Sequence, residues 1–304
     1  MFDHFVVSVV VVPPLAVLVA ALVAGRLAPA LAARVLAWSA VAVAVAGTAN
    51  LLVFALHAVA ELPAVAHLMG WSDRVVRADV AEVPWVSWVC VPLLAAVVAT
   101  VGRTHRRHRR DLRAGRSFPR PDGDVLLVDD SAVTAFAVPG RPGWVVVTRG
   151  MRDALTDRQY AALLAHERAH LDGAHHRLVR LAELAGAAHP ALRWVSAKVG
   201  FLVERAADER AAAEVGDRRL VAQAVGQAAL VAAGRPGLGR TPSVLHAAAG
   251  AVPRRVAALL APARRTSTLP ALLPILVAAG TVVWTGEAVE DLRELLEQAA
   301  GWLG

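Results

Sequence analysis

The sequence predicts a mainly α-helical integral membrane protein with about four transmembrane helices. It also predicts a domain of helices and a small sheet, inserted between the third and the fourth span. Hydrophobic residues make up 57% of the chain, and they are concentrated in blocks of the length that crosses a bilayer. The segment between the third and fourth blocks is instead rich in charge and mixes helical with strand-like patterns.

Four apolar blocks are the predicted spans, and they cover residues 5–24, 35–60, 83–101 and 269–284. The first contains Pro13 and Pro14, so it is expected to be kinked. No Lys or Arg precedes it, which favours a retained span over a cleaved signal peptide. The chain therefore divides into three spans, an inserted domain, and a fourth span with a short acidic tail, at residues 1–102, 103–268 and 269–304.

The distribution of basic residues predicts the orientation in the membrane. Residues 103–265 hold 27 of the 32 Lys and Arg residues, and a basic run at 103–110 directly follows the third span. By the positive-inside rule this end is cytoplasmic, so both termini lie outside a bacterial-type cell membrane and the inserted domain is cytoplasmic. The basic run could also suggest nucleic-acid binding, but its position beside a span favours contact with anionic lipid. No direct nucleic-acid partner is expected.

The inserted domain is expected to begin with short strands and to continue as helices. Apolar runs separated by Pro-Gly turns predict three strands, at residues 125–128, 135–138 and 144–148. Thr156 and Gln159 have the spacing of a capping box that opens a helix. A later helix is expected from His189 to about Val215. Residues 178–203 are apolar enough to touch the membrane surface, but charged residues interrupt them and they are not counted as a span.

The motif that organises this domain is His166-Glu167-Arg168-Ala169-His170, an H-E-x-x-H pattern in a helical stretch. A spacing of four places both imidazoles on one helix face, one turn apart, so they can share one metal ion. Glu167 points about 100° around the helix from His166, which suits proton transfer better than coordination. The alternative is a solvated helix face that carries two histidines by chance.

A catalytic metal needs a third protein ligand, and the single cysteine, Cys90, lies in an apolar block. Glu204 is the candidate ligand. Asp208, one turn later, can accept a hydrogen bond from the far nitrogen of a ligand histidine. The alternative for both carboxylates is a solvated helix face whose charges pair with nearby arginines.

A donor that would stabilise a developing oxyanion is harder to identify from the sequence. The candidates are His246, Arg254 and Arg255, and for each of them a surface charge or a helix cap is the favoured interpretation. The other histidines of this region are expected at surface or loop positions, namely His175, His176 and His189.

Residues 135–208 resemble the integral-membrane metallopeptidases of the BlaR/MecR sensor-transducer type, which are related to the HtpX and CAAX-prenyl proteases. The resemblance is carried by the H-E-x-x-H helix, by Glu204 with Asp208, and by four further segments: residues 135–137, 145–151, 189–192 and 255–259. It implies a gluzincin-like zinc-protease core whose edge strand holds the substrate extended. It also implies that His166, His170 and Glu204 bind Zn²⁺ and that Glu167 is the catalytic base.

The resemblance implies an endopeptidase that hydrolyses peptide bonds at the cytoplasmic face, cutting itself or a transcriptional repressor. The chain has no S-x-x-K followed by K-T-G, so β-lactam sensing through a penicillin-binding domain is not expected. Two alternatives stay open: an HtpX-like quality-control protease, and a non-catalytic membrane signalling scaffold. The expected partners are a peptide or protein substrate and the lipid bilayer. The sequence leaves the oligomeric state open.

Overall fold

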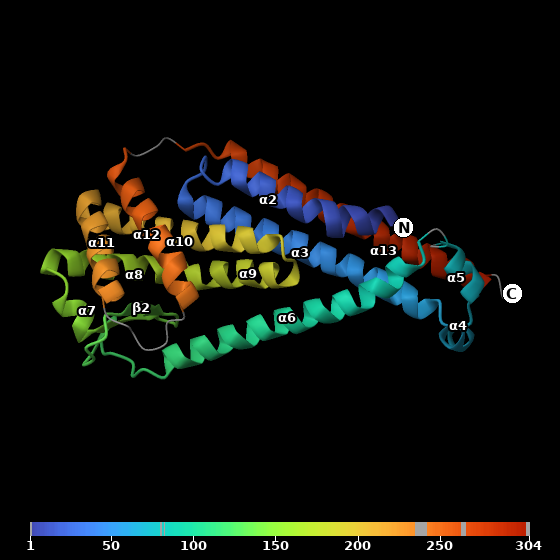
Figure 1. Cartoon of the computed structure of the whole chain (residues 1–304), viewed down its shortest axis with the longest axis horizontal. Coiled ribbons are helices and arrows are strands. Elements are labelled where there is room, and N and C mark those ends of the chain that lie inside the picture. Colours follow the sequence, from blue (N-terminus) through green and yellow to red (C-terminus); the bar gives the residue numbers. More distant parts are fainter. Residues whose placement is uncertain (1, 80, 82, 235–241, 263–265, 302–304) are drawn as a thin grey trace.

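The computed structural model describes residues 2–79, 81, 83–234, 242–262 and 266–301, and for residues 2, 234 and 242–250 it describes the backbone alone. Helices dominate the fold, with one small sheet at one end (Figure 1). Within these residues, four helical segments are long and apolar enough to cross a membrane: Asp3–Val23, Pro29–Ala60, Trp85–Arg116 and Leu269–Gly301. The predicted fold class is therefore confirmed.

The candidate spans form an elongated bundle around α3 (Pro29–Ala60), which contacts both α6 (Trp85–Arg116) and α13 (Leu272–Gly301). The two chain ends lie at the end of the bundle away from the sheet (Figure 1). The same end carries two short helices, α4 (Pro63–Met69) and α5 (Asp73–Asp79), and Ser72 before α5 donates its backbone N–H to Ala299 O at 2.9 Å. The acidic tail is thus a continuation of α13 that packs against this cap.

The first span has the irregularity that Pro13 and Pro14 predict. It consists of α1 (Phe2–Phe5), a π-helical segment η1 (Val6–Val11) and α2 (Val12–Val23). Proline has no backbone N–H, so Pro13 leaves the carbonyl of Val9, four residues earlier, without its α-helical donor. That carbonyl instead lies 3.1 Å from His189 Nε2.

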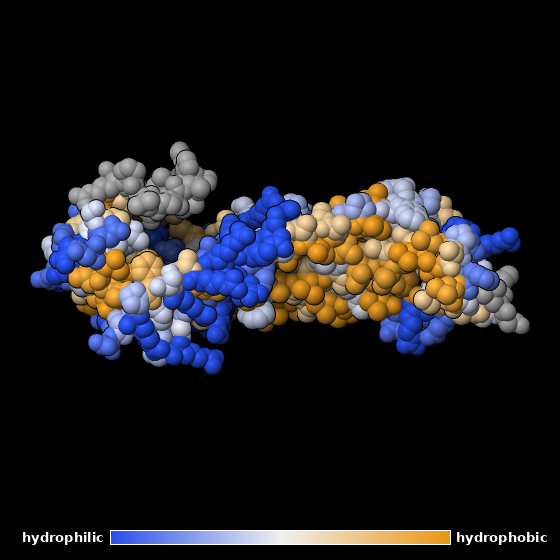
Figure 2. All heavy atoms as spheres, turned by 90° about the horizontal axis from the view of Figure 1, so that it is seen from below, coloured by the Kyte–Doolittle hydropathy of each residue, from blue (hydrophilic) through white to orange (hydrophobic). Residues whose placement is uncertain are grey.

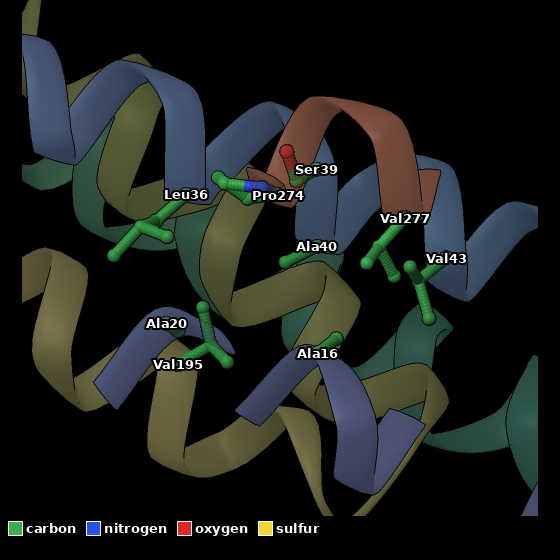
Figure 3. Close-up of a pocket in the computed structure, with 9 residues that line it drawn as sticks. All are labelled: Ala16, Ala20, Leu36, Ser39, Ala40, Val43, Val195, Pro274 and Val277. Atoms are coloured by element: carbon green, nitrogen blue, oxygen red, sulfur yellow. The ribbon is translucent and has the colours of Figure 1, made fainter. Parts of the chain in front are cut away.

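His189 belongs to the tip of a helical hairpin formed by α9 (His175–Ala188) and α10 (Leu192–Val215). Both helices contact α3, and their buried apolar residues share one hydrophobic cluster with α2 and α3. Figure 3 shows Val195 of α10 beside residues of α2, α3 and α13 around a small, nearly apolar pocket. The hairpin therefore packs within the bundle, deeper than the surface contact expected for residues 178–203.

The sequence also differs from the structure at the start of this hairpin. The helix expected from His189 begins at Leu192, and residues 175–188 form a helix of their own. In this helix, Glu183 faces the basic second half of α6. It pairs with Arg107, and Glu183 Oε2 lies 3.2 Å from His108 Nε2. The charge of Glu183, one of those that argue against a span, is thus paired by α6. Because α6 continues to Arg116, the expected domain boundary at residue 102 falls inside this helix.

The surface divides along the long axis of the molecule. Figure 2 shows an apolar body over the bundle and a band of hydrophilic side chains between that body and the unit that carries the sheet. The exposed arginines of α6 lie in the run 103–110 and at Arg113 and Arg116. A body of this kind, with large apolar side chains on its outer face, matches the lipid-facing surface of a multi-pass membrane protein.

The sheet consists of β1 (Val125–Val128), β2 (Ala135–Val138) and β3 (Trp144–Thr148), at the predicted residues. β3 is central, parallel to β1 and antiparallel to β2, and every residue of β3 is buried. β2 is an edge strand that contacts α8 (Asp157–Asp172). The unit also contains α7 (Arg149–Asp153), α11 (Arg218–Gly234) and α12 (Pro242–Leu260). The 3-10 turn η2 (Leu269–Ala271) opens the fourth candidate span and leads into α13.

Candidate metal centre

Helix α8 carries the H-E-x-x-H motif and begins at the predicted capping box. Gln159 donates its backbone N–H to Thr156 Oγ1 at 3.3 Å, and Thr156 donates its own to Gln159 Oε1 at 3.0 Å. The apolar residues of α8 pack on the sheet through a cluster that includes Tyr160, Leu163 and Leu164. With that face fixed against the sheet, the helix presents His166 and His170 to α10, which α8 contacts directly.

The two histidines and Glu204 converge on one point. His166 Nε2 and His170 Nε2 are 3.1 Å apart. Each lies 3.6 Å from an oxygen of Glu204, which α10 supplies. In a tetrahedral zinc site with bonds of about 2.0–2.1 Å, neighbouring ligand atoms are about 3.3 Å apart. The three side chains therefore have the separations and the chemistry to hold a zinc ion.

Asp208 and Arg255 form a buried ion pair behind this point. Arg255 donates from Nε and Nη2 to the two oxygens of Asp208, at 2.8 and 2.7 Å, and its Nη1 lies 2.8 Å from Glu204 Oε2. Asp208 is fully buried, and its Oδ1 lies 3.1 Å from His166 Nδ1 at an angle poor for a hydrogen bond. Arg255 thus fixes both carboxylates of α10, and Asp208 is set behind a candidate ligand.

Glu167 lies beside the candidate ligands and next to the sheet edge. Its carboxylate interacts with the backbone amide of Ala137 in β2, with His166 and with Arg255. Burial raises the pKa of Glu167, although the amide and the two cationic side chains oppose this rise. A carboxylate with a raised pKa beside a metal site is suited to proton transfer, as the motif predicts.

The surroundings give the two histidines different proton affinities. Burial alone would lower the pKa of His166, but Asp208 and Glu204 outweigh it and raise this pKa to about 9. Burial lowers the pKa of His170 to about 3, against the attraction of Glu204. The pKa of Glu204 itself is held below its usual value, because His166 and Arg255 outweigh the effect of burial. The carboxylate is therefore ionised, as a metal ligand must be.

The candidate oxyanion donors fall in different places. The side chain of His246 lies outside the described residues. The guanidinium of Arg254 stacks on the Phe201 ring, with Cζ 4.9 Å from the ring centroid. Arg255 is bound to Asp208 and Glu204, which supports a role in holding these carboxylates.

Sequence reasoning missed His175. It was expected at a surface or loop position, but it is buried at the start of α9, and its Nδ1 lies 3.1 Å from His170 Nδ1. His189 is likewise packed against the first span, whereas His176 is exposed as expected. The pattern gave no signal for His175, because its position depends on the backbone turn between α8 and α9.

Comparisons with known proteins add one match. No curated protein and no solved structure matches the chain. Residues 102–235, which contain the H-E-x-x-H helix together with Glu204 and Asp208, match the family model described as Peptidase family M48, a family of zinc metallopeptidases.

Proposed function

We propose that this protein is a membrane-embedded, zinc-dependent endopeptidase. The observation that carries the proposal is the convergence of His166, His170 and Glu204 at tetrahedral ligand separations, with Glu167 beside them. The match of residues 102–235 to Peptidase family M48 supports the same function. A non-catalytic scaffold has less support, because the candidate ligands and the candidate base are all present at one point.

The proposed chemistry assigns one role to each side chain. His166, His170 and Glu204 would hold the zinc ion, which when bound activates water and polarises the scissile carbonyl. Glu167 accepts the proton of the attacking water on its carboxylate and passes it to the nitrogen of the leaving amine. Arg255 keeps Glu204 and Asp208 in place, and Asp208 supports His166 from behind.

The outer edge of β2 is the proposed position of the substrate backbone. Thr148 N–H bonds to Thr134 O across the β2–β3 pair. By the alternation of an antiparallel ladder, Ala135 and Ala137 then point their backbone groups away from β3. The Ala137 N–H already interacts with the Glu167 carboxylate. The backbone groups of Ala135 and the carbonyl of Ala137 lie along the same edge and can pair with an extended peptide, as in other strand-addition complexes.

Zinc dependence of cleavage tests this function. The full chain, purified in detergent, is expected to cleave itself or unfolded casein, to lose this activity with a zinc chelator, and to regain it when zinc is restored. The physical reason is that proton transfer by Glu167 achieves little without the activated water. Cleavage that persists through complete chelation would contradict the proposal, as would the absence of cleavage of either substrate by zinc-loaded protein.

We further propose that the metal centre faces the cytoplasm. The support is the band of exposed arginines on α6, at the end of the bundle where the turn with Arg26 also lies. Reporter fusions at Met1 and Gly304 are then expected to report an outside location, and one inserted beside Gly123, in an exposed loop before β1, a cytoplasmic location. A cytoplasmic reporter at Gly304 would overturn this orientation.

The role of the protease is proposed to be regulatory, through self-cleavage or cleavage of a repressor, as the resemblance to the BlaR/MecR type implies. The alternative is HtpX-like quality control of membrane proteins. The two differ in the number of substrates: one or two for a regulator, and many for quality control.

A further inference from the structure

We propose that His175 positions the ligand histidine His170 by accepting a hydrogen bond from its Nδ1 atom, an assignment that rests on the proposed zinc function. The two Nδ1 atoms are 3.1 Å apart. The rings meet edge to face, with centroids 4.9 Å apart and an interplanar angle of 89°. His170 thus turns one nitrogen towards the candidate ligands and the other towards His175.

The chemistry of a ligand histidine fixes the direction of this hydrogen bond. A neutral imidazole that coordinates through Nε2 carries its proton on Nδ1. It needs an acceptor there to hold its tautomer and ring orientation. His175 Nδ1 is at hydrogen-bond distance from that proton, so it accepts with its lone pair and carries its own proton on Nε2.

The backbone between α8 and α9 is built to bring His175 to this place. Helix α8 ends at Gly173, and Ala174 has a φ of 47°. Among the described residues, Ala174 is the one non-glycine residue with a positive φ, a conformation that L-residues adopt only at a cost in free energy. Such strain is retained where the surrounding structure requires it, and it clusters at functional sites.

Gly173 is the second feature of this turn that the position of the His175 imidazole requires. A Cβ atom at Gly173 would lie 2.3 Å from His175 Nε2, which is far inside van der Waals contact. The turn therefore needs a residue without a side chain at 173 and a left-handed residue at 174 before the imidazole can return over the end of α8. Neither requirement arises from the packing of α8 on the sheet.

The result is a matched pair of supports for the two candidate ligand histidines. Asp208 stands behind His166, and His175 stands behind His170. Asp208 comes from α10, whereas His175 begins α9, so both arms of the hairpin that packs in the bundle contribute to the orientation of the ligands.

Four variants of the full-length protein test this assignment by zinc affinity, measured by competition with a chelator, and by the absorption spectrum of the cobalt-substituted protein. His175→Asn keeps an acceptor at the place of Nδ1. His175→Gln places its amide group where Nε2 stands and so leaves no acceptor at the place of Nδ1. His175→Leu removes the acceptor altogether. His176→Leu, at the exposed neighbouring position, is the matched control.

The expected result is a loss of zinc affinity of about 10–100-fold in His175→Leu and His175→Gln, with His175→Asn and His176→Leu close to wild type. Gly173→Ala is expected to cause the same loss, because it displaces the ring without removing it. The double variant Gly173→Ala with His175→Leu should then bind zinc no more weakly than either single variant, because both changes remove the same contact.

Two results would overturn the assignment. One is wild-type zinc affinity and an unchanged cobalt spectrum in both His175→Leu and His175→Gln; the other is an equal loss in His175→Asn and His175→Gln. Should His175→Leu fail to fold, the Asn and Gln pair decides. A wild-type protein that binds no zinc contradicts the proposed function itself, whereas zinc binding that is indifferent to residue 175 contradicts this inference alone.

Discussion

Glu167→Gln is expected to lower the rate of peptide cleavage by about 10²–10⁴-fold, the usual contribution of a general base, while zinc stays bound. The amide has the shape of the carboxylate and can still accept from the Ala137 amide, so the sheet edge and α8 should keep their arrangement. It cannot take a proton from water. The measurement is the cleavage rate of the full chain beside its zinc content.

The matched control for this prediction is Glu214→Gln, which removes an exposed carboxylate from the last turns of α10, beyond Glu204 and Asp208. It should leave both the rate and the zinc content unchanged. If Glu167→Gln cleaves at the wild-type rate, Glu167 is not the base. If the variant loses zinc together with activity, Glu167 is needed for zinc binding, and the result does not support a role in proton transfer.

The same inactive variant separates the two proposed roles. Glu167→Gln retains the proposed substrate edge on β2, so it should hold substrates without cleaving them. Proteins cross-linked to it in cells can then be identified. One or two captured proteins would support a regulatory protease, and a large set of unrelated membrane proteins would support quality control.

Glu204→Gln is expected to lower the affinity for zinc by at least about 100-fold, because loss of a ligand should exceed the 10–100-fold effect of losing an outer partner. The amide is a poor zinc ligand, but its oxygen can still accept from Arg255 Nη1, so the fold around Asp208 should survive. Glu209→Gln is the control on the same helix. Glu209 pairs with Arg205 and Arg218, away from the histidines.

Local patterns predicted much of this fold, because the physics that sets them is local. The three strands follow from short apolar runs bounded by turns, and α8 follows from the reciprocal bonds of Thr156 and Gln159. The spans follow from length and apolar content. Each of these signals lies within a few residues of the element that it predicts.

The hairpin of α9 and α10 was underestimated because its partners are distant in sequence. Glu183 argues against packing of this hairpin in the bundle, yet it is half-buried there because Arg107 and His108 of α6 accommodate it. At the tip, His189 meets the Val9 carbonyl, which Pro13 leaves without its α-helical donor. These partners are 76 and 180 positions apart in the sequence, so a local hydrophobic pattern cannot predict that they meet.

The candidate site likewise combines features that local patterns predict with contacts between residues distant in sequence. The spacing of His166 and His170 is helical and could be read directly, and Glu204 with Asp208 could be proposed from one helical turn. The pairing of Arg255 with Asp208 joins α12 to α10, and the contact of His175 with His170 depends on the positive φ of Ala174. Neither contact has a sequence pattern of its own.

The most direct test of the central claim is the zinc content of the full-length protein, measured by elemental analysis after purification without added metal. The account predicts about one zinc per wild-type chain, as expected for a single site with three protein ligands, and almost none in Glu204→Gln. Wild-type protein without zinc, or a Glu204→Gln variant that keeps a full equivalent, would contradict it.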